Sequence, residues 1–344
     1  MYYVSGFART LLKSTINIIT AAGGPEVSNA SSPLVRVDWL ADHLDDPGVR
    51  IIDVRWKSRY ENGKGISLDD PDGYRAGHIP GAVFAGMVAD LSDPTHAIPD
   101  MLAPPDLFAE AMSRLGVGDN TLVVAYDNMG VPLGSARLWW ALSYYGHDHV
   151  RVLDGGLRDW VASGKTVSTQ VNAPTPERFI ARPRPGWLAT KADVLAALSD
   201  QSEVLVDCLN AELFEGGGDR HLWGLRPGHI PGARNVPYLA NVDPALATAT
   251  AAERENVLAS ARSFRFASPD VLRRLYSMAG IEPTDRIITY CGRGYAGACG
   301  LLSLRSIGFT DVRLYDGSWC EWSADPSLPI ETGPARSLTR RNEV

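Results

Sequence analysis

A cysteine set in a glycine-rich stretch is the most reactive feature of this sequence. Residues 290–300 read YCGRGYAGACG, so Cys291 is followed closely by Gly292, Gly294 and Gly297. Glycines let the backbone turn tightly with positive φ, so that successive N–H groups can converge on one point. A helix that we expect to start near Ala296 adds its positive N-terminal end. We therefore expect the pKa of the Cys291 thiol to lie below its ordinary value of about 8.5, and its sulfur to act as a nucleophile.

The elements that position this cysteine are written twice in the chain. Four landmarks recur in the same order, with the second copy 151 to 164 residues after the first. They are the hexapeptide GHIPGA at 77–82 and 228–233, a strand ending in Asp53 and in Asp207, a strand followed by Asp127 and by Cys291, and the pair VRVLDGGLRDW and VRLYDGSWCEW, which contain Asp154 and Asp316. Four ordered matches indicate a duplicated domain.

A proline-rich segment separates the two copies. Residues 169–187 carry four prolines, which remove backbone donors and disfavour helix interiors, so this segment reads as an extended linker. The predicted organisation is a flexible tail at 1–32, a first domain at 33–165, a linker at 166–187, a second domain at 188–335 and a tail at 336–344.

Strands and helices alternate within each copy. The runs LVVAY and RIITY are short, apolar and rich in β-branched residues, as in strands buried on both faces. The run SPDVLRRLYSMAG predicts a helix with Ser268 as N-cap, Pro269 at its first position and Gly280 as its stop, and SARLWWALSYYG predicts one that ends at Gly146. Each copy is therefore expected to be an α/β domain, with a mainly parallel sheet covered by helices on both faces.

The glycine loop also matches the Gly-x-Gly-x-x-Gly turn of dinucleotide-binding domains. Asp316 follows about 20 residues later, as that motif requires. However, too little chain follows the loop for a complete cofactor domain, and the counterpart YDNMGVPLGSA in the first copy lacks the glycine spacing. Cys291 would moreover lie at the C-terminal end of a strand, where open α/β sheets present their chemistry. The cysteine interpretation is favoured, and it requires no metal or organic cofactor.

Composition limits the classes of partner. The formal net charge is -7, which gives no general support for nucleic acid or an anionic membrane as a partner. Four cysteines without a Cys-x-x-Cys pair are too few for a disulfide scaffold and do not suggest zinc, and this usage fits a reducing, cytoplasmic location. The first residues are too polar and too short an apolar run to span a bilayer; a flexible tail is favoured over a poor signal peptide.

The combination of these motifs resembles the rhodanese family of sulfurtransferases. The first copy is similar to the non-catalytic N-terminal domain of thiosulfate and 3-mercaptopyruvate sulfurtransferases, and the second to their catalytic domain, over about 32–331. The resemblance implies two tandem rhodanese-like domains. It also implies that the cysteine takes the outer sulfur of a donor, becomes a persulfide, and passes this sulfur to a thiophilic acceptor.

Carried onto this sequence, the resemblance makes Cys291 the nucleophile and sulfur carrier. Asp127 occupies the equivalent position in the first copy, and because a carboxylate cannot carry sulfur, that copy is expected to wall the active-site cleft. The predicted substrate-binding residues are those of the loop, together with one distant arginine: Gly292, Arg293, Gly294, Tyr295, Ala296 and Arg220.

The choice of donor stays open at this stage. The run CGRG mixes features of thiosulfate and mercaptopyruvate enzymes, and Leu209 and Leu213 stand where the family places anion-binding arginines. Losing a bidentate anion clamp is not a conservative change, so a different or larger donor is conceivable. The expected partners are a small anionic sulfur donor and an acceptor such as cyanide, thioredoxin or another thiol.

Other residues have simpler interpretations. His78 and His229 lie in turns where imidazoles commonly cap backbone groups, and Trp139 and Trp140 are expected to pack on a helix face. The remaining cysteines are expected to be core or partly buried thiols, with a resolving role as the alternative for the last two: Cys208, Cys299 and Cys320.

Two alternative functions can be set against sulfur transfer. A phosphatase on the same fold would need an arginine six positions after the cysteine, to bind the phosphate oxygens. That position is Gly297. The second alternative is a non-catalytic or regulatory rhodanese-like binding protein, which the presence of Cys291 disfavours.

Overall fold

The two copies fold with the same topology. The computed structural model describes residues 32–61, 64–218, 226–260 and 262–335. Each copy contains a five-stranded parallel sheet, in the order β1-β7-β6-β2-β5 and β8-β12-β11-β9-β10. The strands of the first sheet are β1 (Leu34–Val35), β2 (Val49–Asp53), β5 (Val83–Phe84), β6 (Leu122–Tyr126) and β7 (Val150–Leu153). Those of the second sheet are β8 (Leu188–Ala189), β9 (Val204–Asp207), β10 (Arg234–Asn235), β11 (Ile287–Tyr290) and β12 (Val312–Tyr315).

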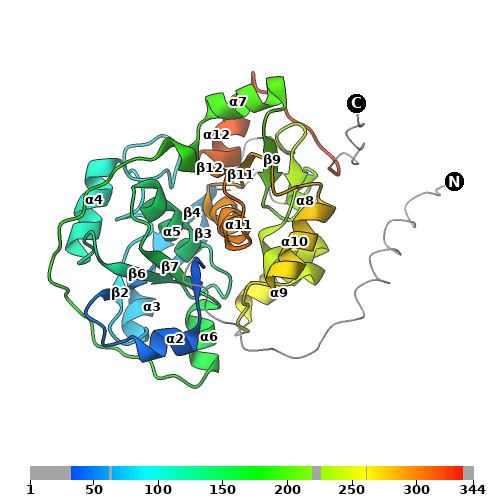
Figure 1. The fold of residues 1–344 in the computed structure, drawn as a ribbon. Helices are drawn as coiled ribbons and strands as arrows, with labels where there is room; N and C mark the ends of the chain where they lie inside the picture. The colour runs from blue at the N-terminus through cyan, green and yellow to red at the C-terminus, as the bar shows by residue number, and fades with distance from the viewer. Residues whose placement is uncertain (1–31, 62–63, 219–225, 261, 336–344) are drawn as a thin grey trace. The chain divides into compact units, whose positions relative to one another are not determined.

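Helices connect these strands and can be followed in Figure 1. In the first copy they are α2 (Val37–Asp42), α3 (Pro71–Ala76), α4 (Pro105–Arg114), α5 (Gly134–Tyr144) and α6 (Gly156–Ala162). In the second they are α7 (Lys191–Asp200), α8 (Ala211–Phe214), α9 (Ala251–Ala259), α10 (Pro269–Met278), α11 (Tyr295–Ser306) and α12 (Ser318–Ala324), with 3-10 turns η1 (Pro185–Trp187), η3 (Tyr238–Asn241) and η4 (Pro244–Thr248).

Both faces of each sheet are buried, as the strand composition predicted. In β6, Val124 belongs to a core cluster with α2, α3 and α6, whereas Val123 and Ala125 belong to another with α4 and α5. The second sheet is covered in the same way, by α7, α8 and α12 on one face and by α10 and α11 on the other. The alternation follows from the twofold repeat of side chains along a strand.

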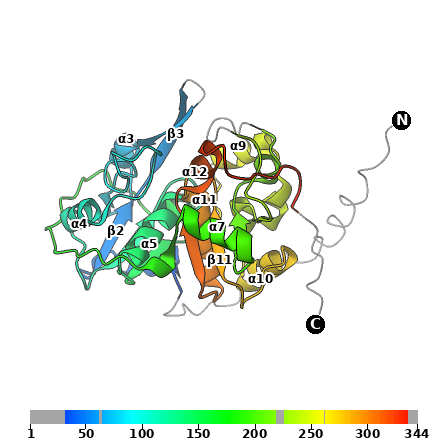
Figure 2. The ribbon, with the colours of Figure 1, turned by 90° about the horizontal axis from the view of Figure 1, so that it is seen from above.

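One hydrophobic cluster runs through both copies. It includes residues of α5 and α11, and these two helices contact each other; they lie side by side in Figures 1 and 2. Trp139 and Trp140 are buried in this cluster, which confirms that they pack within the core. An antiparallel hairpin of β3 (Trp56–Glu61) and β4 (Lys64–Asp69) projects from the first copy.

The predicted helix ends agree with the structure. Helix α10 begins at Pro269 after Ser268, and α11 begins at Tyr295, one residue before the position expected. Gly280 and Gly146 follow α10 and α5 with positive φ, as stop residues that adopt the left-handed region do. Between α6 and η1, the linker segment forms no helix, and its only strand-like contact is the isolated bridge from Ser168 to His78.

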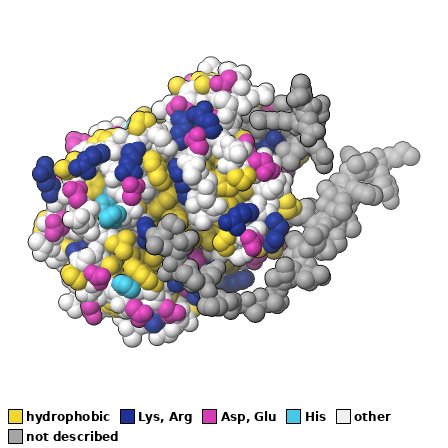
Figure 3. Space-filling model, in the orientation of Figure 1, with side chains coloured by type: hydrophobic (Ala, Val, Ile, Leu, Met, Phe, Trp, Pro, Cys, Tyr) yellow, Lys and Arg dark blue, Asp and Glu magenta, His cyan; other side chains and the backbone are white. Residues whose placement is uncertain are grey.

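The charged side chains of the face shown in Figure 3 are mixed, with acidic and basic groups interspersed. No helix in the described part of the chain combines the length and the hydrophobicity needed to cross a membrane. Of the predicted tails, 1–32 and 336–344, only Ser32 lies within the described residues.

Candidate active site

Cys291 directly follows β11, the central strand of the second sheet. The residue is only 2% exposed, and its sulfur accepts hydrogen bonds from the backbone N–H groups of Gly297, Arg293 and Ala296. Burial raises the pKa of the Cys291 thiol above its ordinary value; these three amides lower the pKa in turn, and the nearby Asp207 raises it. The expected convergence of amides is therefore confirmed. The expected lowering of the pKa is wrong, because desolvation of the thiolate outweighs the hydrogen bonds.

Two of the loop glycines are required by their neighbours. Gly294 has φ +81°, and a Cβ there would lie 2.6 Å from Oδ1 of Asp316 and closer still to Nη1 of Arg137. A Cβ at Gly297 would lie 2.7 Å from a methyl group of Leu314 and 3.2 Å from the backbone of Tyr290. The glycine spacing that resembles a dinucleotide motif is thus explained by close packing of the loop.

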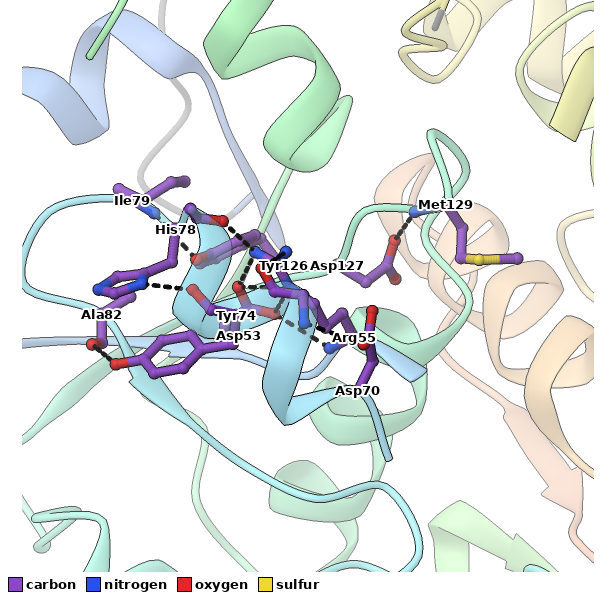
Figure 4. Close-up of polar contacts among 12 residues, drawn as sticks. Asp53, Arg55, Asp70, Tyr74, His78, Ile79, Ala82, Tyr126, Asp127 and Met129 are labelled. Carbon is purple, nitrogen blue, oxygen red and sulfur yellow. Dashed lines mark hydrogen bonds and ion pairs between the residues drawn. The ribbon is translucent and has the colours of Figure 1, made fainter. Parts of the chain in front are cut away.

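The first copy shows what the equivalent loop holds. The buried carboxylate of Asp127 accepts hydrogen bonds from the N–H groups of Met129 (3.1 Å), Leu133 (3.1 Å) and Ser135 (3.0 Å), and from the Ser135 hydroxyl (2.9 Å). Figure 4 shows Met129 donating to this carboxylate. The loop after the central strand therefore surrounds an acidic group with amides in one copy and a sulfur atom with amides in the other.

Arg293 is held by the first copy. Its Nη1 lies 2.8 Å from a carboxylate oxygen of Asp100, and both side chains are almost completely buried, at 7% and 5% exposure. The same nitrogen donates to the backbone oxygen of Gly65 in β4 at 3.1 Å, and Asp100 also accepts a hydrogen bond from Ser67 at 2.8 Å. The guanidinium is thus neutralised by Asp100 in this structure.

A second buried ion pair fixes the loop against the first copy. Arg137 on α5 donates to Asp316 at 2.6 Å and also to the backbone oxygen of Asp100. Tyr295 stacks on Trp56 of the hairpin, with ring centroids 4.6 Å apart, and the guanidinium of Arg137 lies over its ring. Residues of the first copy therefore form one wall around the Cys291 loop.

The contact between the copies is pseudo-symmetric. Asp316 accepts the N–H of Leu102 at 2.8 Å, and its counterpart Asp154 accepts the N–H of Phe266 at 2.9 Å. Leu102 and Phe266 are separated by 164 residues, as Asp127 and Cys291 are. The duplication therefore extends from the individual domains to the bonds that join them.

Arg220 and the two leucines at the expected arginine positions remain to be placed. Arg220 lies outside the described residues. Leu209 and Leu213 are buried in the apolar cluster that includes Cys291. A substrate-binding role for the loop residues and for Arg220 stays a prediction.

The structure agrees with the structural roles expected for the histidines and for the other cysteines. His78 and His229 are buried, and each contacts a backbone oxygen through Nδ1 at 2.8 Å. Cys208 and Cys299 are fully buried and Cys320 is partly buried, all as free thiols. Among the described residues, no group of three or more His, Cys, Asp or Glu is arranged to hold a metal.

Three residues of the site were not identified from the sequence: Asp100, Arg137 and Ser318. An arginine within the apolar run SARLWWALSYYG was a usable signal, because an isolated charge there needs a buried partner. Ser318 could have been found by comparing DGSW with DGGL in the two copies. Asp100 lies in an irregular segment with no pattern that marks it.

Comparison with known proteins gives a consistent result. The family model for the rhodanese-like domain matches residues 36–163 and 190–325. The chain is 36% identical over 298 residues to the 3-mercaptopyruvate sulfurtransferase of Escherichia coli K12, covering 86% of this chain and 97% of that one. It is 30% identical over 353 residues to the mitochondrial thiosulfate/3-mercaptopyruvate sulfurtransferase 1 of Arabidopsis thaliana, covering 96% and 86% of the two chains.

A solved structure has the same fold. The crystal structure of SseA from Escherichia coli, described as a 3-mercaptopyruvate sulfotransferase with the "Rhodanese" fold, superposes with a TM-score of 0.70 at 32% sequence identity. The match covers 84% of this chain and 99% of SseA.

Proposed function

Because this chain belongs to the rhodanese-like domain family, we propose that it is a sulfurtransferase in which Cys291 carries the transferred sulfur. The observation that carries the proposal is the set of three backbone N–H groups on the Cys291 sulfur at the end of the central strand. In the first copy, the equivalent loop surrounds the carboxyl group of Asp127 with backbone N–H groups, so both loops direct amides at an acidic side chain.

The proposed first step loads the cysteine. The thiolate of Cys291 attacks the outer sulfur of the donor, so that a new S–S bond forms. In 3-mercaptopyruvate the C–S bond breaks, and its electron pair stays on carbon, which takes up a proton to give pyruvate. In thiosulfate the S–S bond breaks and sulfite leaves. The amides of Arg293, Ala296 and Gly297 stabilise negative charge on the attacking sulfur and need no reorganisation, because the backbone already holds them.

The proposed second step transfers the outer sulfur of the Cys291 persulfide to an acceptor. A thiophilic acceptor, such as cyanide or a thiol of a small molecule or of thioredoxin, attacks the outer sulfur of the persulfide. The S–S bond breaks and Cys291 leaves as a thiolate, which the same amides receive. Hydrogen bonds to charged groups contribute about 1.5–3 kcal/mol each, so losing one amide should slow both half-reactions.

We propose 3-mercaptopyruvate rather than thiosulfate as the better donor. The described arginine of the loop, Arg293, is paired with Asp100, so its charge is already compensated. A site with reduced positive potential favours a donor with one carboxylate over a dianion. The names of the relatives from Escherichia coli and Arabidopsis thaliana, which include 3-mercaptopyruvate, support the same choice.

Steady-state assays test this function. We expect turnover of 3-mercaptopyruvate with a dithiol acceptor, slower turnover of thiosulfate with cyanide, and none of either in Cys291→Ser. That variant is nearly isosteric and should keep the urea unfolding midpoint of the parent protein. Retained turnover in Cys291→Ser would remove Cys291 from the mechanism, and absence of turnover in the parent with both donors would favour a binding role.

A further inference from the structure

Ser318 occupies a turn where the first copy uses glycine. It follows Gly317 in the run DGSW, and its counterpart in DGGL is Gly156, 162 residues earlier. Both residues have left-handed backbone conformations, with φ +50° for Ser318 and φ +57° for Gly156. Glycine adopts this region without strain, whereas a residue with a Cβ does not. The second copy thus keeps a serine with a strained backbone at a position where the first copy has glycine.

The turn makes the same backbone contact in both copies. The N–H of Trp319 donates to the oxygen of Cys291 at 2.9 Å, and that of Leu157 donates to the oxygen of Asp127 at 3.0 Å. This bond holds the turn against the loop without the serine. The hydroxyl of Ser318 must therefore add something that the first copy does not need.

The hydroxyl is fully used by the catalytic loop. Ser318 is completely buried, and its Oγ accepts the N–H groups of Cys291 and Gly294, both at 3.2 Å, while donating to the oxygen of Tyr315 at 2.8 Å. A hydroxyl has one donor and two acceptor sites. All three are occupied, so its orientation is fixed.

The two amides that Ser318 holds alternate along the loop with those that hold the sulfur. The amides of Cys291 and Gly294 point to Oγ, and those of Arg293, Ala296 and Gly297 point to the sulfur. Fixing the amides of Cys291 and Gly294 constrains the neighbouring peptide planes, because the backbone has only two soft dihedral angles per residue. Backbone strain that persists at a buried position is typical of functional sites.

We propose that Ser318 is a positioning residue for sulfur transfer, whose hydroxyl holds the backbone of the Cys291 loop so that the neighbouring amides face the sulfur. This proposal rests on the proposed function only for the reaction that the loop serves, because the geometry of the loop exists without a donor. Ser318 contacts no reacting atom in this account and acts through the amides.

Two substitutions test the role. Ser318→Gly removes the hydroxyl and relieves the strained φ, so it reproduces the first copy; Ser318→Ala removes the hydroxyl and keeps the strain. In both, we expect kcat with 3-mercaptopyruvate to fall about tenfold to a hundredfold, with KM within about threefold. This is less than the roughly 10²–10³-fold loss on removing a direct donor, because the amides stay in the loop and lose only their alignment. The matched control is Gln201→Gly, which relieves a similar φ of +54° at an exposed position after α7 and should leave kcat unchanged.

A donor-free measurement separates this proposal from the proposed function. The rate of Cys291 alkylation by iodoacetamide, followed by mass spectrometry against pH, gives the pKa of the thiol in each variant. We expect this pKa to rise in Ser318→Gly and Ser318→Ala, because the sulfur stays buried while its amides lose alignment. A pKa that stays or falls in both variants overturns the proposal, even when kcat falls, since the loss would then reflect a purely structural role.

Discussion

Replacing Gly294 with alanine should destabilise the protein far more than an ordinary glycine substitution. The new Cβ would lie 2.6 Å from Oδ1 of Asp316 and in conflict with Nη1 of Arg137, so this buried ion pair must separate. Breaking a buried pair costs about 3–5 kcal/mol, and a non-glycine residue at φ +81° costs a further 1–2 kcal/mol approximately. The sum, about 4–7 kcal/mol, is a large part of the 5–15 kcal/mol that typically stabilises a protein.

The assay is urea unfolding of Gly294→Ala beside a matched control. Gly308→Ala has a similar left-handed backbone, with φ +99°, but its Cβ would meet nothing within 4 Å, so it should lose only about 1–2 kcal/mol. The difference between the two variants isolates the collision with the ion pair. If Gly294→Ala loses no more stability than Gly308→Ala, the loop does not rest on the Arg137–Asp316 pair and the packing argument fails.

Three further predictions concern charge. Asp100→Asn removes the carboxylate that holds Arg293, so steady-state kinetics should show KM for 3-mercaptopyruvate falling about threefold to tenfold; an unchanged KM means Arg293 does not meet the donor. Burial raises the pKa of Cys291, so single-turnover loading from thiosulfate should still accelerate above about pH 8.5; a plateau below pH 8 contradicts this. Burial raises the pKa of Asp154 to about 6, above its unfolded value. The folded protein therefore becomes less stable as the pH rises from roughly 4 to 6. In urea unfolding, Asp154→Asn should be more stable by up to about 3 kcal/mol at pH 7, and a loss there refutes it.

The parts of the fold that repetition or periodicity encodes were predictable from the sequence. The recurrence of GHIPGA and of the runs around Asp154 and Asp316 indicated the duplication, and the sheets of the two copies have matching strand orders. Short β-branched runs predicted strands buried on both faces, because such strands show no polar alternation. Cys291 was marked by its place after the second such strand and by the glycines around it.

The parts that depend on contacts between the two copies were not predictable in this way. A role of Arg293 toward a substrate stays a prediction. Its pairing with Asp100 was not foreseen, because Asp100 lies in an irregular segment of the first copy. The pKa of Cys291 depends on burial, which the loop sequence alone does not determine. Ser318 was visible as a departure from its duplicate, yet only the structure shows that its hydroxyl bonds the amides of the loop.

Intact-protein mass spectrometry after incubation with 3-mercaptopyruvate or thiosulfate, followed by peptide mapping, tests most directly whether the amide-lined loop carries sulfur on Cys291. The account predicts a mass gain of one sulfur atom, confined to the peptide that contains Cys291 and absent from Cys291→Ser. A protein that gains no sulfur from either donor, or gains it on Cys208, Cys299 or Cys320 instead, would contradict the account.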